Sequence, residues 1–190
     1  MLEVEQFYPE TKQHWRAWLE QNHQLKDAVW LIMYNKKSTK STIKWSDAVD
    51  EALCFGWIDS KKIKIDDERV HQFFSKRKPQ STWSKINKDK VEKLIEQGLM
   101  TNAGYKSIEI AKENRSWNIL DEVEALVIPL DLEKAFGRYV GSKDYFISLS
   151  KSVKKMMLQW IVLAKRPETR NNRIEEIVFL ASQSKKPKQF

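Results

Sequence analysis

The sequence has few of the residues that mark a specialised class of protein. One cysteine, Cys54, excludes an internal disulfide and favours a reducing compartment, so we expect a cytoplasmic location. The longest apolar runs, near residues 29–34 and 160–164, are too short to cross a bilayer. The first residues are acidic and lack the basic-then-apolar order of a secretion signal. These absences argue against a secreted, disulfide-bonded or membrane-spanning protein.

Motifs of known chemistry are also missing. The chain contains no phosphate-binding glycine loop, no dinucleotide-binding glycine turn, no Gly-x-Ser-x-Gly motif and no His-Glu-x-x-His motif. Its three histidines are scattered, which argues against a histidine-based metal centre. We therefore predict no metal, no cofactor and no catalytic residue, and we favour a non-enzymatic protein over an enzyme.

Aromatic residues and positive charge are plentiful instead. The 190 residues are 41% hydrophobic and include eight tryptophans, which is enough apolar surface for a core. The net charge is +8, and residues 138–190 hold twelve Lys and Arg against four Asp and Glu. The remaining residues are therefore neutral overall. The basic C-terminal third predicts either attraction to nucleic acid, an anionic membrane surface or an acidic partner, or simply a solvated helical face.

The hydrophobic pattern predicts an α+β fold with a small antiparallel sheet packed by helices. Residues 29–34 form an apolar run typical of a buried strand. Residues 57–65 and 69–76 alternate around a short polar turn and predict a hairpin with a bulge near Ser60-Lys61. We expect one α+β domain over residues 1–124 and a basic helical domain over residues 125–190.

Helix boundaries follow from capping residues. We expect a first helix over residues 9–22. A second helix is predicted between an N-cap at Ser46 and a left-handed Gly56, and further helices are predicted to start after the N-caps Asn87, Thr101 and Asp131. An apolar stripe from Asp144 to Ala164 predicts one sustained helix. Pro167 is expected to open the final helix, on which Arg170 and Arg173 are predicted to be partly buried and to need acidic partners.

Two clusters could carry chemistry or recognition. Glu51 shares a helix flank with Asp47 and Asp50, and Asp59 follows on the next strand. Such carboxylates could act as general acids and bases or could neutralise Arg77, Lys78, Arg170 or Arg173, and we favour the ion network. The segment 75–87 interleaves basic and aromatic residues, a weak pattern for single-stranded nucleic acid.

Three segments resemble the YdeI/OmpD-associated, or bacteriocin-protection, family. They are Trp45-Ser-Asp-Ala-Val-Asp-Glu-Ala-Leu-Cys-Phe-Gly-Trp-Ile-Asp59, Ser75-Lys-Arg-Lys-Pro-Gln-Ser-Thr-Trp-Ser-Lys-Ile-Asn87 and Ala164-Lys-Arg-Pro-Glu-Thr-Arg-Asn-Asn-Arg-Ile174. The resemblance runs over nearly the whole chain, and the basic helical third corresponds to the small C-terminal domain of the family. It implies a link to tolerance of bacteriocins and cationic antimicrobial peptides, with no established catalytic activity.

We therefore expect a non-enzymatic binding protein for an unidentified protein, peptide or small molecule. A nucleic-acid-binding protein, or a small-molecule enzyme with a carboxylate base, remain the alternatives. Direct capture of a cationic peptide would need an acidic surface, for which residues 47–51 are the candidate. The binding surface is predicted to join the three segments through Glu51, Trp57, Asp59, Arg77, Ser81, Trp83, Asn87, Arg170 and Arg173.

Overall fold

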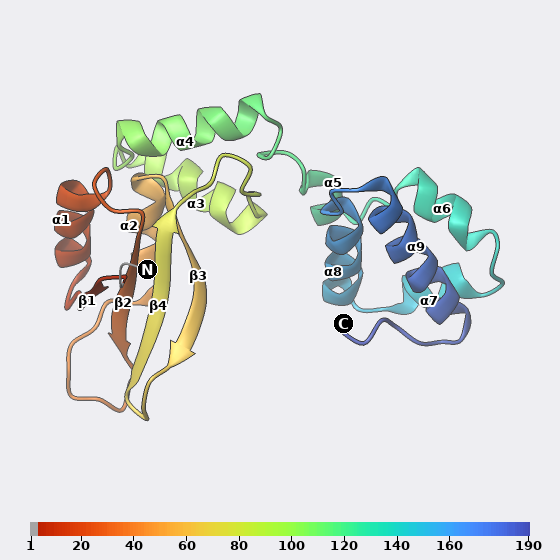
Figure 1. Cartoon of the computed structure of the whole chain (residues 1–190), viewed down its shortest axis with the longest axis horizontal. Helices are drawn as coiled ribbons and strands as arrows, with labels where there is room; N and C mark the ends of the chain where they lie inside the picture. The colour runs from red at the N-terminus through yellow and green to blue at the C-terminus, as the bar shows by residue number, and fades with distance from the viewer. Residues whose placement is uncertain (1–3) are drawn as a thin grey trace. The chain divides into compact units, whose positions relative to one another are not determined.

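A computed structural model describes residues 4–190 and divides the chain into two compact units, one ending at Trp117 and the other running from Asn118 to Phe190. The predicted α+β class is confirmed. Figure 1 shows strands only in the first unit and helices in both. The sequence predicted the boundary at residues 124 and 125.

Over residues 4–117 the first unit contains a four-stranded sheet and four helices. Its elements are β1 (Gln6–Phe7), α1 (Lys12–Asn22), β2 (Ala28–Tyr34), α2 (Trp45–Cys54), β3 (Trp57–Lys64), β4 (Arg69–Lys76), α3 (Lys85–Glu96) and α4 (Asn102–Glu113). The strand order is β1-β2-β4-β3, and the predicted hairpin of β3 and β4 is confirmed. Its register shifts between Asp59 and Lys62, where the bulge was expected. The expectation of an antiparallel sheet was wrong at one edge, because the two-residue β1 pairs parallel to β2.

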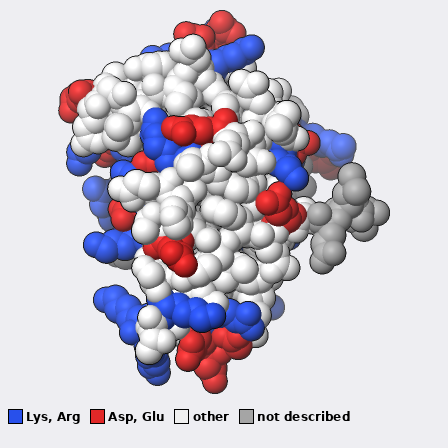
Figure 2. Space-filling model, turned by 90° about the vertical axis from the view of Figure 1, so that its left-hand side faces the viewer, with Lys and Arg blue, Asp and Glu red and all other residues white. Residues whose placement is uncertain are grey.

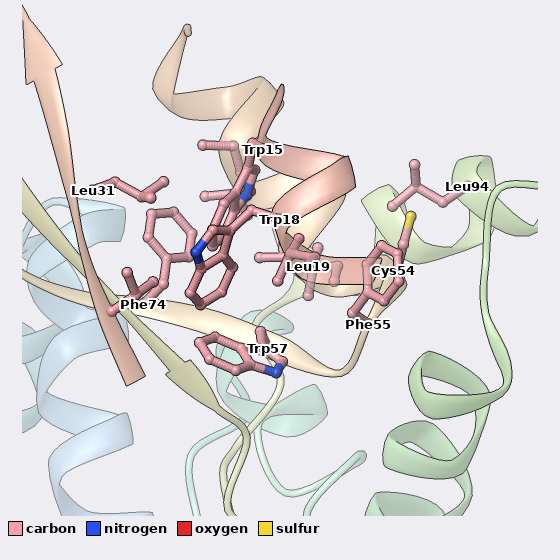
Figure 3. Close-up of a cluster of buried hydrophobic side chains, with 14 of the residues drawn as sticks. Trp15, Trp18, Leu19, Leu31, Cys54, Phe55, Trp57, Phe74 and Leu94 are labelled. Carbon is pink, nitrogen blue, oxygen red and sulfur yellow. The ribbon is translucent and has the colours of Figure 1, made fainter. Parts of the chain in front are cut away.

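The core of this unit is a tryptophan cluster between α1 and the sheet. Trp15 stacks on Trp18 with ring centroids 5.2 Å apart, and Trp18 meets the edge of Trp57 at 5.8 Å. Figure 3 shows these rings between Phe74 of the sheet and the helices. The buried Trp15 indole also donates through Nε1 to the carbonyl oxygen of Ala48 at 3.0 Å, so its polar atom is satisfied.

The second unit is entirely helical in its regular structure. It contains α5 (Asp121–Glu124), α6 (Leu130–Phe136), α7 (Ser142–Ser148), α8 (Lys151–Val162) and α9 (Pro167–Ser182). Pro167 opens α9 as predicted. Its own core is formed by large apolar side chains that include Leu132, Phe146, Ile161 and Ile177. No helix within residues 4–190 is both long enough and apolar enough to span a membrane.

Three helices of the first unit begin at other residues than predicted. The first helix was predicted to begin at Pro9, but it begins at Lys12, after Thr11, which accepts a hydrogen bond from the His14 N–H. Ser84 caps α3, so Asn87 lies inside its first turn. Ser46 lies inside α2, which begins one residue earlier. The capping side chains of α1 and α3 each satisfy one free N–H group at the start of the helix, whereas α2 has no side-chain cap.

Two further boundaries in the second unit were also wrong. Asp131 lies inside α6, which begins at Leu130 after Pro129. The stripe predicted as one helix is broken at Leu149, whose backbone is extended, and Ser150 caps α8 by accepting from the Val153 N–H. The apolar spacing continues across the break, which is why the pattern alone did not reveal it.

Candidate functional site

The first unit contains an open pocket of about 560 Å³. It lies between the end of β4 with the following segment and the first turns of α4. Gly56 helps to form it, because this residue has a φ of +71° and a Cβ atom there would lie 2.9 Å from the Ala103 carbonyl oxygen. The charged and titratable residues that line the pocket are His23, Lys76, Arg77, Lys78 and Lys106. Within the described chain its lining contains no carboxylate.

Arg77 is the most unusual of these side chains. Its guanidinium carbon lies 3.6 Å from the centroid of the Trp83 ring, and Nη1 donates to the Thr82 carbonyl oxygen at 3.1 Å. Its Nε is buried without a hydrogen-bond partner in the described chain. Burial lowers the pKa of Arg77 to about 10, and the charge of Asp59 only partly opposes this effect. Arg77 is therefore a half-buried cation with a buried Nε and without an ion-pair partner among residues 4–190.

The lysines around Arg77 add positive potential at the pocket mouth. Lys78 and Lys106 are exposed, whereas Lys76 lies 3.0 Å from an oxygen of Asp27. Lys106 lies on the first turns of α4, where the helix dipole also favours a negative ligand. This arrangement is suited to binding an anion, because the charged lining groups repel one another until a negative group enters.

Three of the predicted site residues line this pocket: Trp57, Arg77 and Trp83. The acidic residues do not. Glu51 is buried and forms ion pairs with Arg16 at 2.8 Å and with Lys12 at 3.2 Å. This is an ion network, as the sequence favoured, but its cations are not the predicted ones. Asp59 accepts hydrogen bonds from the Trp45 indole at 2.9 Å and from Gln72 at 3.4 Å.

The remaining predicted residues have local structural contacts. The Ser81 N–H donates to the Lys78 carbonyl oxygen at 2.9 Å, and the Asn87 N–H donates to Ser84. Arg170 and Arg173 lie in the second unit, so the predicted joint surface of all three segments stays a prediction. Sequence reasoning missed Lys106, because nothing in the spacing of α4 indicates that it lies beside residues 76–79.

Arg170 and Arg173 support the packing of α9 in different ways. Arg170 forms a two-point ion pair with Asp131, through Nε at 2.6 Å and Nη2 at 2.9 Å. Arg173 donates to the Trp160 carbonyl oxygen and stacks over the Trp160 ring. The acidic partner expected for Arg170 is thus present, whereas the bond described for Arg173 is to a backbone oxygen.

The Asp131 pair predicts acid sensitivity. The hydrogen bond from Arg170 holds the pKa of Asp131 below its ordinary value of 3.8. A depressed carboxyl pKa contributes stability above the unfolded value, and this contribution is lost as the pH falls through the folded value. We expect Asp131→Asn to lower the urea midpoint at neutral pH and to flatten its fall below about pH 4. Asp144→Asn, an exposed residue without a described partner, is the control; an equal effect of both changes would contradict the pair.

Comparisons with known proteins match the two parts of the chain to different families. Residues 7–107 match the family described as "Domain of unknown function (DUF8412)", and residues 125–184 match "Bacteriocin-protection, YdeI or OmpD-Associated". No curated protein and no solved structure matches the chain.

The expected resemblance to the bacteriocin-protection family is therefore shown for the C-terminal part, including residues 164–174, and not over nearly the whole chain. Neither family description names a nucleic acid or a catalysed reaction, so the nucleic-acid and enzyme alternatives gain no support. With more than half of its residues matched, the chain belongs to the family described as "Domain of unknown function (DUF8412)", and it carries a C-terminal segment similar to the bacteriocin-protection family.

Proposed function

We propose that the protein is a non-enzymatic binding protein that contributes to tolerance of bacteriocins and cationic antimicrobial peptides by holding an anionic ligand in the Arg77 pocket. The similarity of residues 125–184 supports the link to tolerance. One observation supports the ligand: Arg77 is half-buried with a buried Nε, is stacked on Trp83 and has no ion-pair partner in the described chain, beside a pocket lined by lysines. An unpaired, desolvated charge destabilises a folded protein. Binding of an anionic ligand compensates this cost, so the arrangement suits a ligand site.

The same charges argue against direct capture of a cationic peptide in the pocket. A positive peptide would be repelled by Arg77, Lys78 and Lys106. The acidic flank of α2 offers little free charge, because Asp50 is paired with Lys90 at 2.5 Å and Glu51 is paired as described above, which leaves Asp47 as its one carboxylate without a described ion pair. Protection would therefore act through an anionic molecule that the protein binds, not through sequestration of the peptide.

A functional role for Arg77 predicts that its removal stabilises the protein. Burial of its unpaired charge costs on the order of 3 kcal/mol, given the depressed pKa. The bond to Thr82 and the stacking on Trp83 return about 1 kcal/mol each. We expect Arg77→Met to raise the free energy of unfolding by about 1 kcal/mol in urea denaturation.

Arg16→Met is the matched control, because Arg16 is an arginine with a buried carboxylate partner. Its removal leaves Glu51 with Lys12 alone, so we expect a loss of stability instead of a gain. Two changes of the same type should therefore shift the urea midpoint in opposite directions. A loss of stability in Arg77→Met equal to that in Arg16→Met would make Arg77 a structural residue and remove the support for the ligand.

The link to tolerance is tested in a bacterial strain that lacks the gene. The wild-type protein should restore survival under a panel of bacteriocins and cationic peptides. A double variant, Lys78→Gln with Lys106→Gln, changes only exposed side chains of the pocket mouth and should restore less. Lys62→Gln, on the exposed part of β3, should behave as wild type. Unchanged survival with and without the wild-type gene would refute the proposal.

A further inference from the structure

We infer that the ligand of the Arg77 pocket carries a phosphomonoester dianion on an organic group. This inference rests on the proposed anion-binding function and narrows it to one chemical class. Phosphomonoesters carry close to two negative charges at neutral pH and offer three terminal oxygens. Carboxylates and phosphodiesters carry one charge. The pocket distinguishes these classes by the number of cations it presents and by the free edge of its arginine.

Arg77 has a guanidinium edge that no described residue occupies. Nη1 is used by the Thr82 carbonyl oxygen, whereas Nε has no partner in the described chain, and no bond of Nη2 is found there. Nε and Nη2 together form an edge of the guanidinium that binds two oxygens of one oxyanion side by side. The stacking on Trp83 fixes the plane of this edge. Nε is covered by protein, so an oxyanion reaches it only by displacing the atoms over this edge, and it would then give Nε its missing acceptor.

The cations that line the pocket also favour a dianion. Lys76 is neutralised by Asp27, but Lys78 and Lys106 line the pocket without a described ion pair. Together with Arg77 they present three positive charges around one cavity. A single negative charge would leave this cluster strongly positive, whereas a dianion with a third oxygen for the lysines would balance most of it.

The pocket has room for an organic group beside the phosphate. Its volume of about 560 Å³ lies in the range of small-molecule sites and is far more than a phosphate group alone fills. Apolar surface comes from Phe55, Pro79 and Ile110. The first turn of α4, with Asn102 and Ala103, also lines the cavity. The phosphate is therefore expected at the basic side, and the organic group along the apolar wall.

Matched pairs of compounds test this class. The full-length protein is titrated with adenosine 5′-monophosphate and its cyclic diester, and with glucose 6-phosphate and glucuronate, by isothermal calorimetry at fixed pH and salt. Vesicles with and without phosphatidic acid in phosphatidylcholine provide the lipid arm. We expect at least one phosphomonoester to bind about tenfold tighter than its singly charged partner, the size of one charge-assisted hydrogen bond.

The variants assign the binding to this pocket. Lys78→Gln and Lys106→Gln should each weaken the phosphomonoester about tenfold, whereas Lys62→Gln on β3 should leave its affinity unchanged. Arg77→Met should abolish measurable binding while the protein stays folded in thermal unfolding. These changes place the phosphate among the named cations, because a site elsewhere would be indifferent to them.

The outcomes separate this inference from the function on which it rests. Binding of a soluble phosphomonoester or retention on phosphatidic-acid vesicles, with the expected loss in the lysine variants, supports the class and identifies its source. Equal binding of the singly charged compounds through Arg77 overturns the phosphomonoester class and leaves the anion-binding function intact. Absence of binding to every compound and vesicle overturns both.

Discussion

Replacement of Gly104 by alanine is expected to lower the free energy of unfolding by about 3 kcal/mol. A Cβ atom at this position would lie 2.4 Å from the carbonyl oxygen of Cys54 and 2.9 Å from its carbonyl carbon. Both obstacles are backbone atoms, so α2 and α4 must move apart. Alanine favours a helix over glycine by about 1 kcal/mol, but this gain is smaller than the cost of the clash.

The contact at Gly104 also supports two hydrogen bonds. The N–H and the Oγ1 of Thr101 donate to the Cys54 carbonyl oxygen at 3.1 Å and 2.7 Å. Separation of the helices would lengthen both. Urea denaturation followed by circular dichroism measures the effect, and Gly137→Ala is the control, because its Cβ would meet only the Lys134 carbonyl oxygen at 3.3 Å. A Gly104→Ala protein as stable as the control variant would show that the two helices separate without cost.

Removal of the Glu51 charge is the second change with a large expected effect. Glu51 is 2% exposed, and its carboxylate joins α1 to α2 through Lys12 and Arg16. Burial by itself lowers the pKa of Arg16, but the hydrogen bond and charge of Glu51 outweigh burial and raise it. Glu51→Gln keeps the shape but removes the anion that Lys12 and Arg16 share, and of these two cations only Arg16 keeps another described ion pair, with Glu20 at 3.3 Å. We therefore expect a loss of about 3 kcal/mol.

The matched control is Asp47→Asn on the same helix, where no ion pair is described. It should change the urea midpoint little, as is usual for a side chain without a strong partner. A stable Glu51→Gln protein with reduced tolerance in cells would contradict the structural role of Glu51. It would instead return this carboxylate to the candidates for a functional site.

Local sequence patterns predicted the elements better than their ends. The alternation in residues 57–76 predicted the hairpin and its bulge, because both depend on neighbouring side chains. At the start of α3, two capping residues compete, and the pattern cannot rank Ser84 above Asn87. The parallel edge strand Gln6–Phe7 is only two residues long and carries no periodic signal.

The site was predictable where it depends on one segment. Arg77 and Trp83 are six residues apart in the basic and aromatic segment 75–87, both were predicted site residues, and they stack in the structure. Lys106 joins them only because α4 packs back on residue 56, a contact that no local pattern encodes. The spacing of Glu51 is typical of a polar residue on an exposed helix flank. It is buried because α1 packs against this flank and provides Arg16, which lies 35 residues earlier in the sequence, as its partner.

The charge pattern was informative about the whole chain and not about the pocket. The first 137 residues are neutral overall, yet the pocket in this part contains a local excess of cations. On the face drawn in Figure 2, Lys and Arg side chains lie close to Asp and Glu side chains over a largely uncharged surface. The net charge of a segment sums cations and anions that neutralise one another. It therefore does not reveal the cations of the pocket that have no described ion pair.

Because Cys54 is buried, the reaction of its thiol with a reagent reports how often the first unit opens. The thiol is fully buried, and burial together with the charge of Glu51 raises its pKa to about 11. A thiol reagent can therefore react only when α2 separates from its neighbours, so the rate of labelling measures how often the first unit opens. The second unit has no cysteine, and Trp160 is its single tryptophan. The labelling rate of the intact chain therefore measures the opening of the first unit alone, so the two units need not be separated for this experiment.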